Sequence, residues 1–277
     1  MPTSLSPLRY PGGKSKLFGL VSSLLKNNFP SNNGNLTYIE PFAGGSGLAI
    51  KLLMEGIVNR IVLNDFDYAI YCVWELIVNN SNLLCDFIKL VPLNISEWKK
   101  QRFIYENYQN YNSIQLGLAT FYLNRTNVSG IIKGGVIGGL SQSGKYKMDA
   151  RFNRIELINR VKKISQSRES IDLYYWDAKD FIFDVLPKYE NTFIYFDPPY
   201  VKKGPSLYKN AFAMEDHISL FDAIVVCDKK WIVTYDYCDF IKDLYKNFDT
   251  DTLSIHYSTG QVKNGNEIII YSPSILH

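Results

Sequence analysis

Short apolar runs alternate with segments of helical spacing over much of the chain. The runs are four to six residues long and rich in β-branched and aromatic side chains, which is typical of buried strands. Strands that alternate with helices predict an α/β domain with a mostly parallel sheet. We expect strands at Thr37–Glu40, Arg60–Asn64, Ile171–Trp176, Thr192–Phe196 and Trp231–Tyr235, and helices at Ser46–Met54 and about Tyr68–Val78.

Two parts of the chain depart from this alternation. Near the end, Ser254–Tyr257 and Glu267–Tyr271 flank the polar loop Gly260–Asn266, which predicts an antiparallel hairpin. In the middle, residues 79–163 show no clear order of strands and helices. At roughly 150 residues per domain, a chain of 277 residues fits one domain that carries an insert. We therefore expect one domain made of residues 1–78 and 164–277, interrupted by an insert at 79–163.

Charge is concentrated in the expected insert. The whole chain has a net charge of +3, from 30 basic and 27 acidic residues. Residues 125–163 alone contain nine basic and two acidic residues, a local charge of +7, which leaves −4 for the rest. A basic, polar insert in an otherwise acidic domain favours a surface that faces phosphates. The alternative is a solvated face with a flexible loop.

Several classes of protein are disfavoured. Hydrophobic residues make up 46% and charged residues 21% of the chain, which is enough for a full core. The four cysteines form no CxxC pair and the three histidines lie far apart, so we expect reduced thiols, no disulfide framework and no metal site. No apolar stretch approaches the ~18 residues of a membrane span, so we expect a soluble intracellular protein.

The sharpest motif is Asp197-Pro198-Pro199-Tyr200, directly after an expected strand. Open α/β sheets bind ligands at the carboxyl ends of their strands. The two prolines stiffen the turn and leave carbonyl oxygens free to accept hydrogen bonds. Asp197 adds a carboxylate acceptor and Tyr200 a flat ring, a combination that suits a planar base with an exocyclic amino group. The alternative is a rigid turn in which Asp197 only caps a neighbouring element.

Two further motifs lie nearer the start. Glu40-Pro41-Phe42-Ala43-Gly44-Gly45-Ser46-Gly47 joins an expected strand to a helix, but Ile50 occupies the third glycine position of the dinucleotide fingerprint. The turn still allows a ligand without pyrophosphate to approach the backbone. Asp65 ends the next strand, where it could accept from ribose hydroxyls or cap the following helix. The segment Arg9–Ser15 mimics a phosphate-binding loop, but Leu8 stands where that motif needs glycine.

Taken in order, these segments resemble one family. Tyr10-Pro11-Gly12-Gly13-Lys14, then Glu40-Pro41-Phe42 with Gly44 and Gly47, then Asp197-Pro198-Pro199-Tyr200 is similar to the Dam-type (D12 class) DNA adenine N6-methyltransferases. The basic insert lies where that family places target recognition. Within the insert, Tyr122-Leu123-Asn124-Arg125 followed by Gly130 resembles the family's recognition segment.

The resemblance implies a Rossmann-like, S-adenosylmethionine-dependent methyltransferase domain interrupted by a largely helical target-recognition insert. The cofactor would be S-adenosyl-L-methionine, with Asp65 at its ribose and Asp177 at its adenine amino group. Asp197, Pro198 and Tyr200 would be catalytic. The expected cofactor-binding residues are Tyr10, Lys14, Glu40, Phe42, Gly44, Gly47, Asp65, Asp177 and Asp197.

The implied reaction is methyl transfer to the N6-amino group of adenine in double-stranded DNA. Hydrogen bonds from the amine to Asp197 and to the Pro198 carbonyl would localise its lone pair, and the flipped adenine would stack on Tyr200. The expected DNA-binding residues are Asn124, Arg125, Lys133, Lys145, Lys147 and Arg151. Gly138–Asn153 matches the family's Arg-x-Asn-x-x-Gly-x-Phe-Asn run only in part, so GATC specificity does not follow.

Other readings of the sequence remain open. The acceptor geometry fits cytosine N4 or an RNA adenine as well, although the order of motifs favours DNA adenine. A DNA-binding module without turnover is a rival of a different class. As partners we expect double-stranded DNA and no membrane or metal, and a cognate restriction endonuclease is a further candidate partner. We expect a cytoplasmic, nucleoid-associated location.

Overall fold

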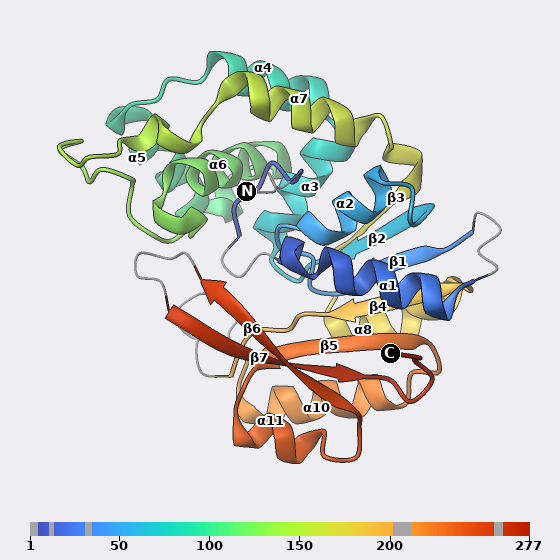
Figure 1. Ribbon diagram of the computed structural model, residues 1–277. Helices are drawn as coiled ribbons and strands as arrows, with labels where there is room; N and C mark the ends of the chain where they lie inside the picture. The colour runs from blue at the N-terminus through green and yellow to red at the C-terminus, as the bar shows by residue number, and fades with distance from the viewer. Residues whose placement is uncertain (1–4, 11–13, 31–34, 202–211, 258–262) are drawn as a thin grey trace. The chain divides into compact units, whose positions relative to one another are not determined.

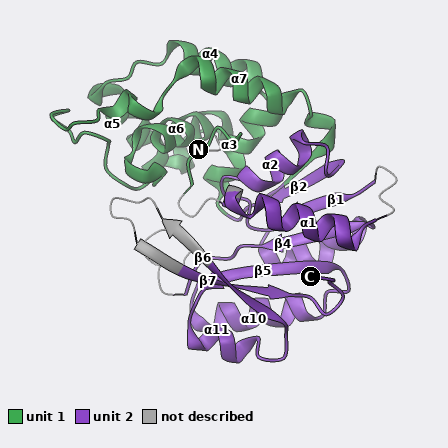
Figure 2. Cartoon of the chain, viewed as in Figure 1, with its two compact units in different colours: residues 1–13, 67–173 green, residues 14–66, 174–277 purple. Residues whose placement is uncertain are grey.

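The computed structural model describes residues 5–10, 14–30, 35–201, 212–257 and 263–277. Contacts between Cα atoms divide the chain into two compact units (Figure 2). Unit 1 comprises Met1–Gly13 and Asp67–Leu173, and unit 2 comprises Lys14–Phe66 and Tyr174–His277. Each unit is therefore built from two separate segments of the chain. The expected insert, residues 79–163, lies wholly within unit 1.

Unit 2 contains six strands, and only the last residue of β3, of a seven-stranded sheet with the order β3-β2-β1-β4-β5-β7-β6 (Figure 1). Strand β1 pairs in parallel with β2 and β4, and β4 pairs in parallel with β5. Strand β7 is antiparallel to both β5 and β6. The strands are β1 Thr37–Glu40, β2 Arg60–Asn64, β3 Ile171–Tyr174, β4 Thr192–Phe196, β5 Lys230–Asp236, β6 Thr250–Tyr257 and β7 Lys263–Tyr271.

The helices that follow β3, β4 and β5 cover one face of this sheet through a shared apolar core. Ile39, Ile194 and Val233 contribute alternate strand positions to that core. Phe181 and Ile224 face them from the helical side. The helices of unit 2 are η1 Lys14–Leu17, α1 Phe18–Asn28, α2 Gly47–Met54, α8 Ala178–Asp180, η6 Phe181–Val185, η7 Leu186–Lys188, α10 Met214–Val225 and α11 Asp239–Leu244.

The strand residues between these core positions point to the other face, and several of them are polar. Strand β4 is buried over its whole length because it has a parallel neighbour on each side. Period-two alternation puts Tyr195 and Asp197 on the face opposite to Ile194 and Phe196. On the antiparallel side, Glu267 is directly opposite Asp236 and therefore shares its face.

Apart from the first three residues of β3, the described elements of unit 1 are helices. Its helices are α3 Tyr68–Asn79, α4 Ser81–Leu90, α5 Ile95–Glu106, η2 Tyr108–Asn110, α6 Ser113–Thr126, η3 Val128–Gly130, η4 Met148–Arg151, α7 Arg154–Ser165 and η5 Arg168–Ser170. Helix α6 begins with a capping box in which Asn112 and Gln115 satisfy each other's backbone N–H groups. Cys72 of α3 and Leu116 of α6 belong to one buried cluster.

The expected α/β fold with a mostly parallel sheet is confirmed. The helix expected at Tyr68–Val78 forms as Tyr68–Asn79, and the expected terminal hairpin forms as β6 and β7. The strand expected at Ile171–Trp176 ends earlier, at Tyr174. It stops because the Trp176 N–H donates to the Asn64 side chain at 2.9 Å and not to a neighbouring strand.

Candidate active site

Asp197 leaves the carboxyl end of β4 with its carboxylate fixed from the neighbouring strand. Thr234 Oγ1 on β5 donates to Asp197 Oδ1 at 3.0 Å, and Tyr195 Oη lies 2.7 Å from the same Thr234 oxygen. An ionised carboxylate only accepts and a hydroxyl has one proton, so Tyr195 donates to Thr234 and Thr234 to Asp197. This chain of hydroxyls, from β4 and β5, orients the Asp197 carboxylate.

A buried lysine completes the surroundings of Asp197. Lys14 Nζ lies 3.1 Å from Asp197 Oδ1, and 3.0 and 3.2 Å from the two carboxylate oxygens of Glu267. It also donates to the hydroxyl of Tyr200, which in turn donates to Glu267 Oε1. We call Lys14, Asp197, Tyr200 and Glu267 the Lys14 cluster. Its members come from η1, from the loop after β4 and from β7, and all belong to unit 2.

The charges of the Lys14 cluster support one another. Burial alone would lower the pKa of Lys14, but the carboxylates of Asp197 and Glu267 outweigh burial and raise it. Burial raises the pKa of Asp197; Lys14 opposes that shift and the negative charge of Glu267 adds to it. Lys14 is therefore a fixed positive charge, and Asp197 takes up a proton at a higher pH than an ordinary aspartate.

One oxygen of the Asp197 carboxylate is left for another molecule. Both the Lys14 and the Thr234 contacts use Oδ1. Within the described residues no hydrogen bond to Oδ2 is found, and the side chain is 25% exposed. An ionised carboxylate oxygen can accept two hydrogen bonds. Asp197 can therefore accept from an amino group brought to the carboxyl end of β4.

Sequence reasoning missed Glu267 and Thr234, although both are at the centre of the site. Glu267 is fully buried at the start of the apolar run Ile268–Tyr271. The only available signal was a single acidic residue at the edge of an otherwise buried strand. Tyr200 was expected to stack on a base; its side chain is almost fully buried in the Lys14 cluster, and the stacking role stays a prediction.

The turn after β1 holds a second buried carboxylate. Tyr38 Oη donates to Glu40 Oε1 at 3.2 Å, and burial raises the pKa of Glu40 to about 8. Gly44 and Ser46 have φ angles of +48° and +41°, so the turn uses the left-handed region twice before α2 begins at Gly47. Phe42 packs its ring against the core below the sheet. Glu40 is thus held as part of the fold of this turn.

We expect the free energy of unfolding of the wild type to fall as the pH rises, and we expect this fall to be absent in Glu40→Gln. The folded-state pKa of about 8 lies above the ordinary value of 4.5, so the contribution of the neutral carboxyl group is complete below pH 4.5 and is lost as the pH rises through 8. The slope is at most about 1.4 kcal/mol per pH unit. Urea unfolding of both proteins between pH 5 and 8 measures it, with the exposed Glu55→Gln as the control. Parallel stability curves for wild type and Glu40→Gln would contradict this assignment.

Asp65 joins the ends of β1 and β2. Its Oδ2 accepts the Gly44 N–H at 2.7 Å. The cap of α3 is Asp67, whose side chain accepts from the Ala69 N–H, so the capping interpretation of Asp65 is wrong. Buried Asn64 beside it donates to the carbonyls of Pro41 and Trp176, both at 3.0 Å. No motif pointed to this amide, which connects the ends of β1, β2 and β3.

Asp177 follows the end of β3 and caps the short helix α8, with Oδ1 accepting from the Lys179 N–H at 2.9 Å. Nearby aromatic side chains are exposed. The rings of Phe66 and Tyr175 stack with centroids 6.2 Å apart, and both are about half exposed. Carboxylates and flat apolar rings thus gather at the ends of β2 and β3.

The family model for D12 class N6 adenine-specific DNA methyltransferases matches residues 10–263 of the chain. The chain belongs to this family. Members of the family methylate DNA, at the N6 position of adenine, so this chain is a DNA methyltransferase. The match runs from the Tyr10–Lys14 motif to the beginning of β7.

Three named relatives are type II methyltransferases. M.MjaIII of Methanocaldococcus jannaschii is 24% identical over 87% of this chain and 88% of its own. M.CviBI of Paramecium bursaria Chlorella virus NC1A is 24% identical over 76% of this chain and 77% of its own. M1.LlaDCHI of Lactococcus lactis subsp. cremoris is 21% identical over 91% of this chain and 88% of its own. The similarity therefore extends over both units of the methyltransferase.

The expected DNA-binding residues fall into two groups in unit 1. The first group is exposed and consists of Lys133, Lys145, Lys147 and Arg151. The second group, Asn124 and Arg125, is buried on α6. Arg125 donates to the carbonyls of Pro7 and Arg151, and burial lowers its pKa to about 9. The exposed group is free of the core and can reach phosphates.

Asn124 holds the N-terminal segment of the methyltransferase against α6. Its Oδ1 accepts the Arg9 N–H at 2.8 Å, and its Nδ2 donates to the Arg9 carbonyl at 2.6 Å and to the Gly130 carbonyl at 3.0 Å. Gly130 has a φ of +78°, and a Cβ there would come within 2.5 Å of the Arg9 carbonyl oxygen. Arg9 and Tyr10 precede Pro11–Gly13, which lie outside the described residues. Contact of Asn124 with the target site stays a prediction.

We expect Asn124→Ala to lower the free energy of unfolding by about 3 kcal/mol, because it leaves the N–H and carbonyl of the partly buried Arg9 and the carbonyl of the buried Gly130 without their amide partner. Chemical unfolding measures the loss. Asn159→Ala, at an exposed position of α7, is the matched control and should change stability by less than about 0.5 kcal/mol. Equal effects of the two substitutions would show that the amide does not hold this segment.

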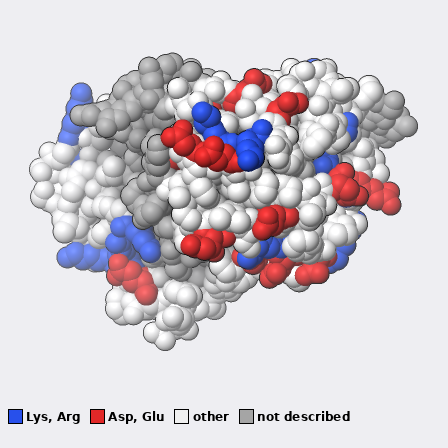
Figure 3. All heavy atoms as spheres, turned by 90° about the horizontal axis from the view of Figure 1, so that it is seen from below, with Lys and Arg blue, Asp and Glu red and all other residues white. Residues whose placement is uncertain are grey.

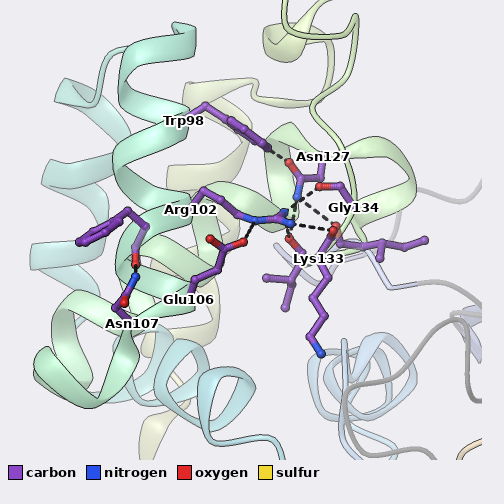
Figure 4. A network of polar contacts seen from close by, with 10 residues as sticks. Trp98, Arg102, Glu106, Asn107, Asn127, Lys133 and Gly134 are labelled. Atoms are coloured by element: carbon purple, nitrogen blue, oxygen red, sulfur yellow. Dashed lines mark hydrogen bonds and ion pairs between the residues drawn. The ribbon is translucent and has the colours of Figure 1, made fainter.

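The loop after α6 is braced from α5 (Figure 4). Arg102 donates to the carbonyls of Ile132, Lys133 and Gly134 at 2.9 to 3.2 Å. Asn127 donates to the carbonyls of Ile131 and Ile132, and Trp98 Nε1 donates to Asn127 Oδ1 at 2.7 Å. With its carbonyls taken up by these donors, the loop presents the Lys133 side chain to solvent.

Charge on the face shown in Figure 3 is mixed. Acidic and basic side chains are interspersed there, without one large area of a single sign. Such a face attracts a polyanion weakly because fields of opposite sign cancel. In the described part of the chain no cluster of three or more His, Cys, Asp or Glu residues suits a metal ion, and no helix is long and apolar enough to cross a membrane.

Proposed function

We propose that this DNA methyltransferase transfers the methyl group of S-adenosyl-L-methionine to the N6-amino group of an adenine that is flipped out of duplex DNA at a specific site. The observation that carries the proposal is the environment of Asp197, directly after β4. Its Oδ1 contacts Lys14 and Thr234, and its Oδ2 can accept a hydrogen bond from an amino group. Membership of an adenine-specific family supports the same target.

The residues at the ends of β1, β2 and β3 fit this cofactor. Asp65 is partly exposed and follows the carboxyl end of β2, and its carboxylate is an acceptor that suits ribose hydroxyls. Asp177 offers an acceptor for the adenine amino group, and Phe66 offers an exposed flat face. When bound, S-adenosylmethionine supplies an electrophilic methyl group on a sulfonium sulfur. We assign the further cofactor contacts to Tyr10, Lys14, Glu40, Phe42, Gly44, Gly47 and Asp197.

Asp197 and Pro198 would act on the target amine. The N6 lone pair of adenine is delocalised into the ring, and hydrogen bonds from the amine to Asp197 Oδ2 and to the Pro198 carbonyl localise it on nitrogen. N6 would gain the methyl carbon as the sulfur–carbon bond of the donor breaks and S-adenosylhomocysteine leaves, and N6 would lose one proton, which Asp197 could receive because its pKa is raised. Most of the acceleration then comes from positioning and from fixed charges around the amine.

DNA would be held by unit 1. N6 lies inside a duplex and cannot reach the donor, so the base must leave the stack. Lys133, Lys145, Lys147 and Arg151 are exposed and positively charged, which suits phosphates. Target reading is assigned to the region of Asn124 and Arg125 and to the loop braced by Arg102. The relatives are named type II methyltransferases, which supports a restriction–modification setting. Our proposal adds a cognate endonuclease as partner and action on DNA in the cytoplasm.

Two binding measurements test the donor and the flipping step. Titration calorimetry with S-adenosylmethionine should give saturable binding that Asp65→Asn weakens about tenfold, whereas the exposed Asp184→Asn leaves it unchanged. DNA with 2-aminopurine at the methylated position should gain fluorescence on binding. Absence of cofactor binding would refute the proposed donor, and unchanged fluorescence in a tight DNA complex would refute flipping.

A further inference from the structure

Glu267 is a carboxylate in the interior of the sheet, outside every motif that identifies the family. It is fully buried, and β7 pairs on one side with β5, where Asp236 is opposite Glu267, and on the other with β6, where Leu253 is opposite. A buried carboxylate is strongly unfavourable unless it is paired and hydrogen-bonded. Isoleucine would fit this buried strand position without that loss of free energy. A carboxylate here is therefore expected to have a specific partner.

That partner is the pair of Lys14 and Tyr200. Both Glu267 oxygens lie within 3.2 Å of Lys14 Nζ, and Oε1 also accepts the Tyr200 hydroxyl. Lys14 donates to the Tyr200 hydroxyl as well, so the three side chains form a closed ring of hydrogen bonds. The ammonium lies 4.9 Å from the centroid of the Tyr200 ring. Glu267 therefore fixes both a charge and a ring that adjoin Asp197.

The charge count around Asp197 shows what Glu267 contributes. Lys14 provides one positive charge for two carboxylates. With Glu267 present, the ammonium is already matched, and Asp197 keeps its negative charge available at Oδ2. Without Glu267, Asp197 would be the sole partner of Lys14 and a weaker acceptor for an incoming amine. A neutral residue at position 267 would also release Lys14 and Tyr200 from their fixed positions.

We propose that Glu267 is a positioning residue for methyl transfer, which holds Lys14 and Tyr200 in place and matches the charge of Lys14, so that Asp197 is a more basic acceptor. The proposal rests on the proposed function of Asp197. Glu267 itself touches neither base nor donor and acts through its two neighbours. Its effect should therefore appear in the chemical step and not in the affinity for DNA.

The test compares wild type with Glu267→Gln, which keeps the size of the side chain and removes its charge. We expect kcat to fall about 30-fold with KM for DNA changed less than threefold. The acid limb of the kcat profile should move to lower pH, because the charge of Glu267 is one cause of the raised pKa of Asp197. Glu267→Asp, which restores the charge, should recover part of both. Wild-type kcat and an unmoved limb in Glu267→Gln would overturn the proposal.

Other titratable groups near Asp197 need a control. Lys14 faces Asp197 from η1, Glu40 and Tyr38 from β1, Tyr235 from β5, and Tyr195 precedes it on β4. Glu40 titrates at about 8, so the profile is also recorded in Glu40→Gln. The proposal is supported if the acid limb of the kcat profile is present in Glu40→Gln and moves when Glu267→Gln is added. If the limb disappears in Glu40→Gln, the assignment of this limb to Asp197 is overturned.

Folding and turnover are separated by two further variants. If Glu267→Gln does not fold, Tyr200→Phe decides, because it removes only the hydroxyl that Lys14 and Glu267 share and should still lower kcat. In urea unfolding, Lys14→Met/Glu267→Gln should be more stable than Lys14→Met alone, whereas additive losses would overturn the pairing. A wild type without turnover would refute the proposed function, and the unfolding data would then decide the pairing by themselves.

Discussion

Asp197→Asn should lower methyl transfer about 10³-fold while leaving DNA binding within a factor of about two. The substitution keeps the shape of the side chain and its contact with Thr234, but it removes the negative charge that the target amine meets. Loss of one fixed electrostatic partner in an active site typically costs 10²- to 10³-fold, and loss of a group that also handles the proton adds to this. Steady-state transfer of labelled methyl groups measures the rate, and a filter or mobility assay measures DNA affinity.

The control is Asp184→Asn, an exposed aspartate of η6 in the same unit, which should retain the wild-type rate. A rate for Asp197→Asn within tenfold of wild type would remove Asp197 from the catalytic role. A large loss of DNA affinity would instead point to a structural defect, and unfolding of the variant should then show reduced stability.

Lys14→Met should destabilise unit 2 by about 3–5 kcal/mol at pH 8, because it leaves the buried carboxylate of Glu267 and the partly buried carboxylate of Asp197 without a counter-charge. The loss should shrink towards pH 5. There Asp197, whose pKa is raised, can take up a proton, and this removes one of the two negative charges that Lys14 no longer balances. Urea unfolding at the two pH values measures both effects.

Lys16→Met is the matched control, two residues along and exposed, and should change stability little at either pH. A loss in Lys14→Met that is the same at pH 5 and pH 8 would mean that the missing ammonium matters for packing and not for charge. A loss below about 1 kcal/mol would show that the carboxylates find other partners.

The sequence allowed the fold and one half of the site to be predicted, for a physical reason. Asp197 and Pro198 are consecutive, so the motif and its place after an apolar strand can be read from neighbouring residues. The partners of Asp197 cannot. Thr234 and Glu267 reach it through the register of β4, β5 and β7, and nothing in a single sequence fixes that register.

Unit 1 shows the same limit in another form. Asn124 and Arg125 are polar, lie near a basic stretch and were expected at the DNA. In the fold they are buried on α6, where they bind the backbone of Arg9 and Pro7 from far away in the sequence. The exposure of Lys133, Lys145 and Lys147 depends less on packing and could be predicted from the basic composition of this stretch alone. Burial of a polar side chain depends on packing that local sequence does not determine.

The most direct test of the account is to identify the base that receives the methyl group. Wild-type protein and Asp197→Asn are incubated with labelled S-adenosylmethionine and unmethylated genomic DNA, or with RNA, and the nucleosides are separated and identified by mass. The account predicts labelled N6-methyladenine in DNA, in one short sequence context, with wild type and almost none with Asp197→Asn. Label in N4-methylcytosine or only in RNA, or no label despite cofactor binding, would contradict it.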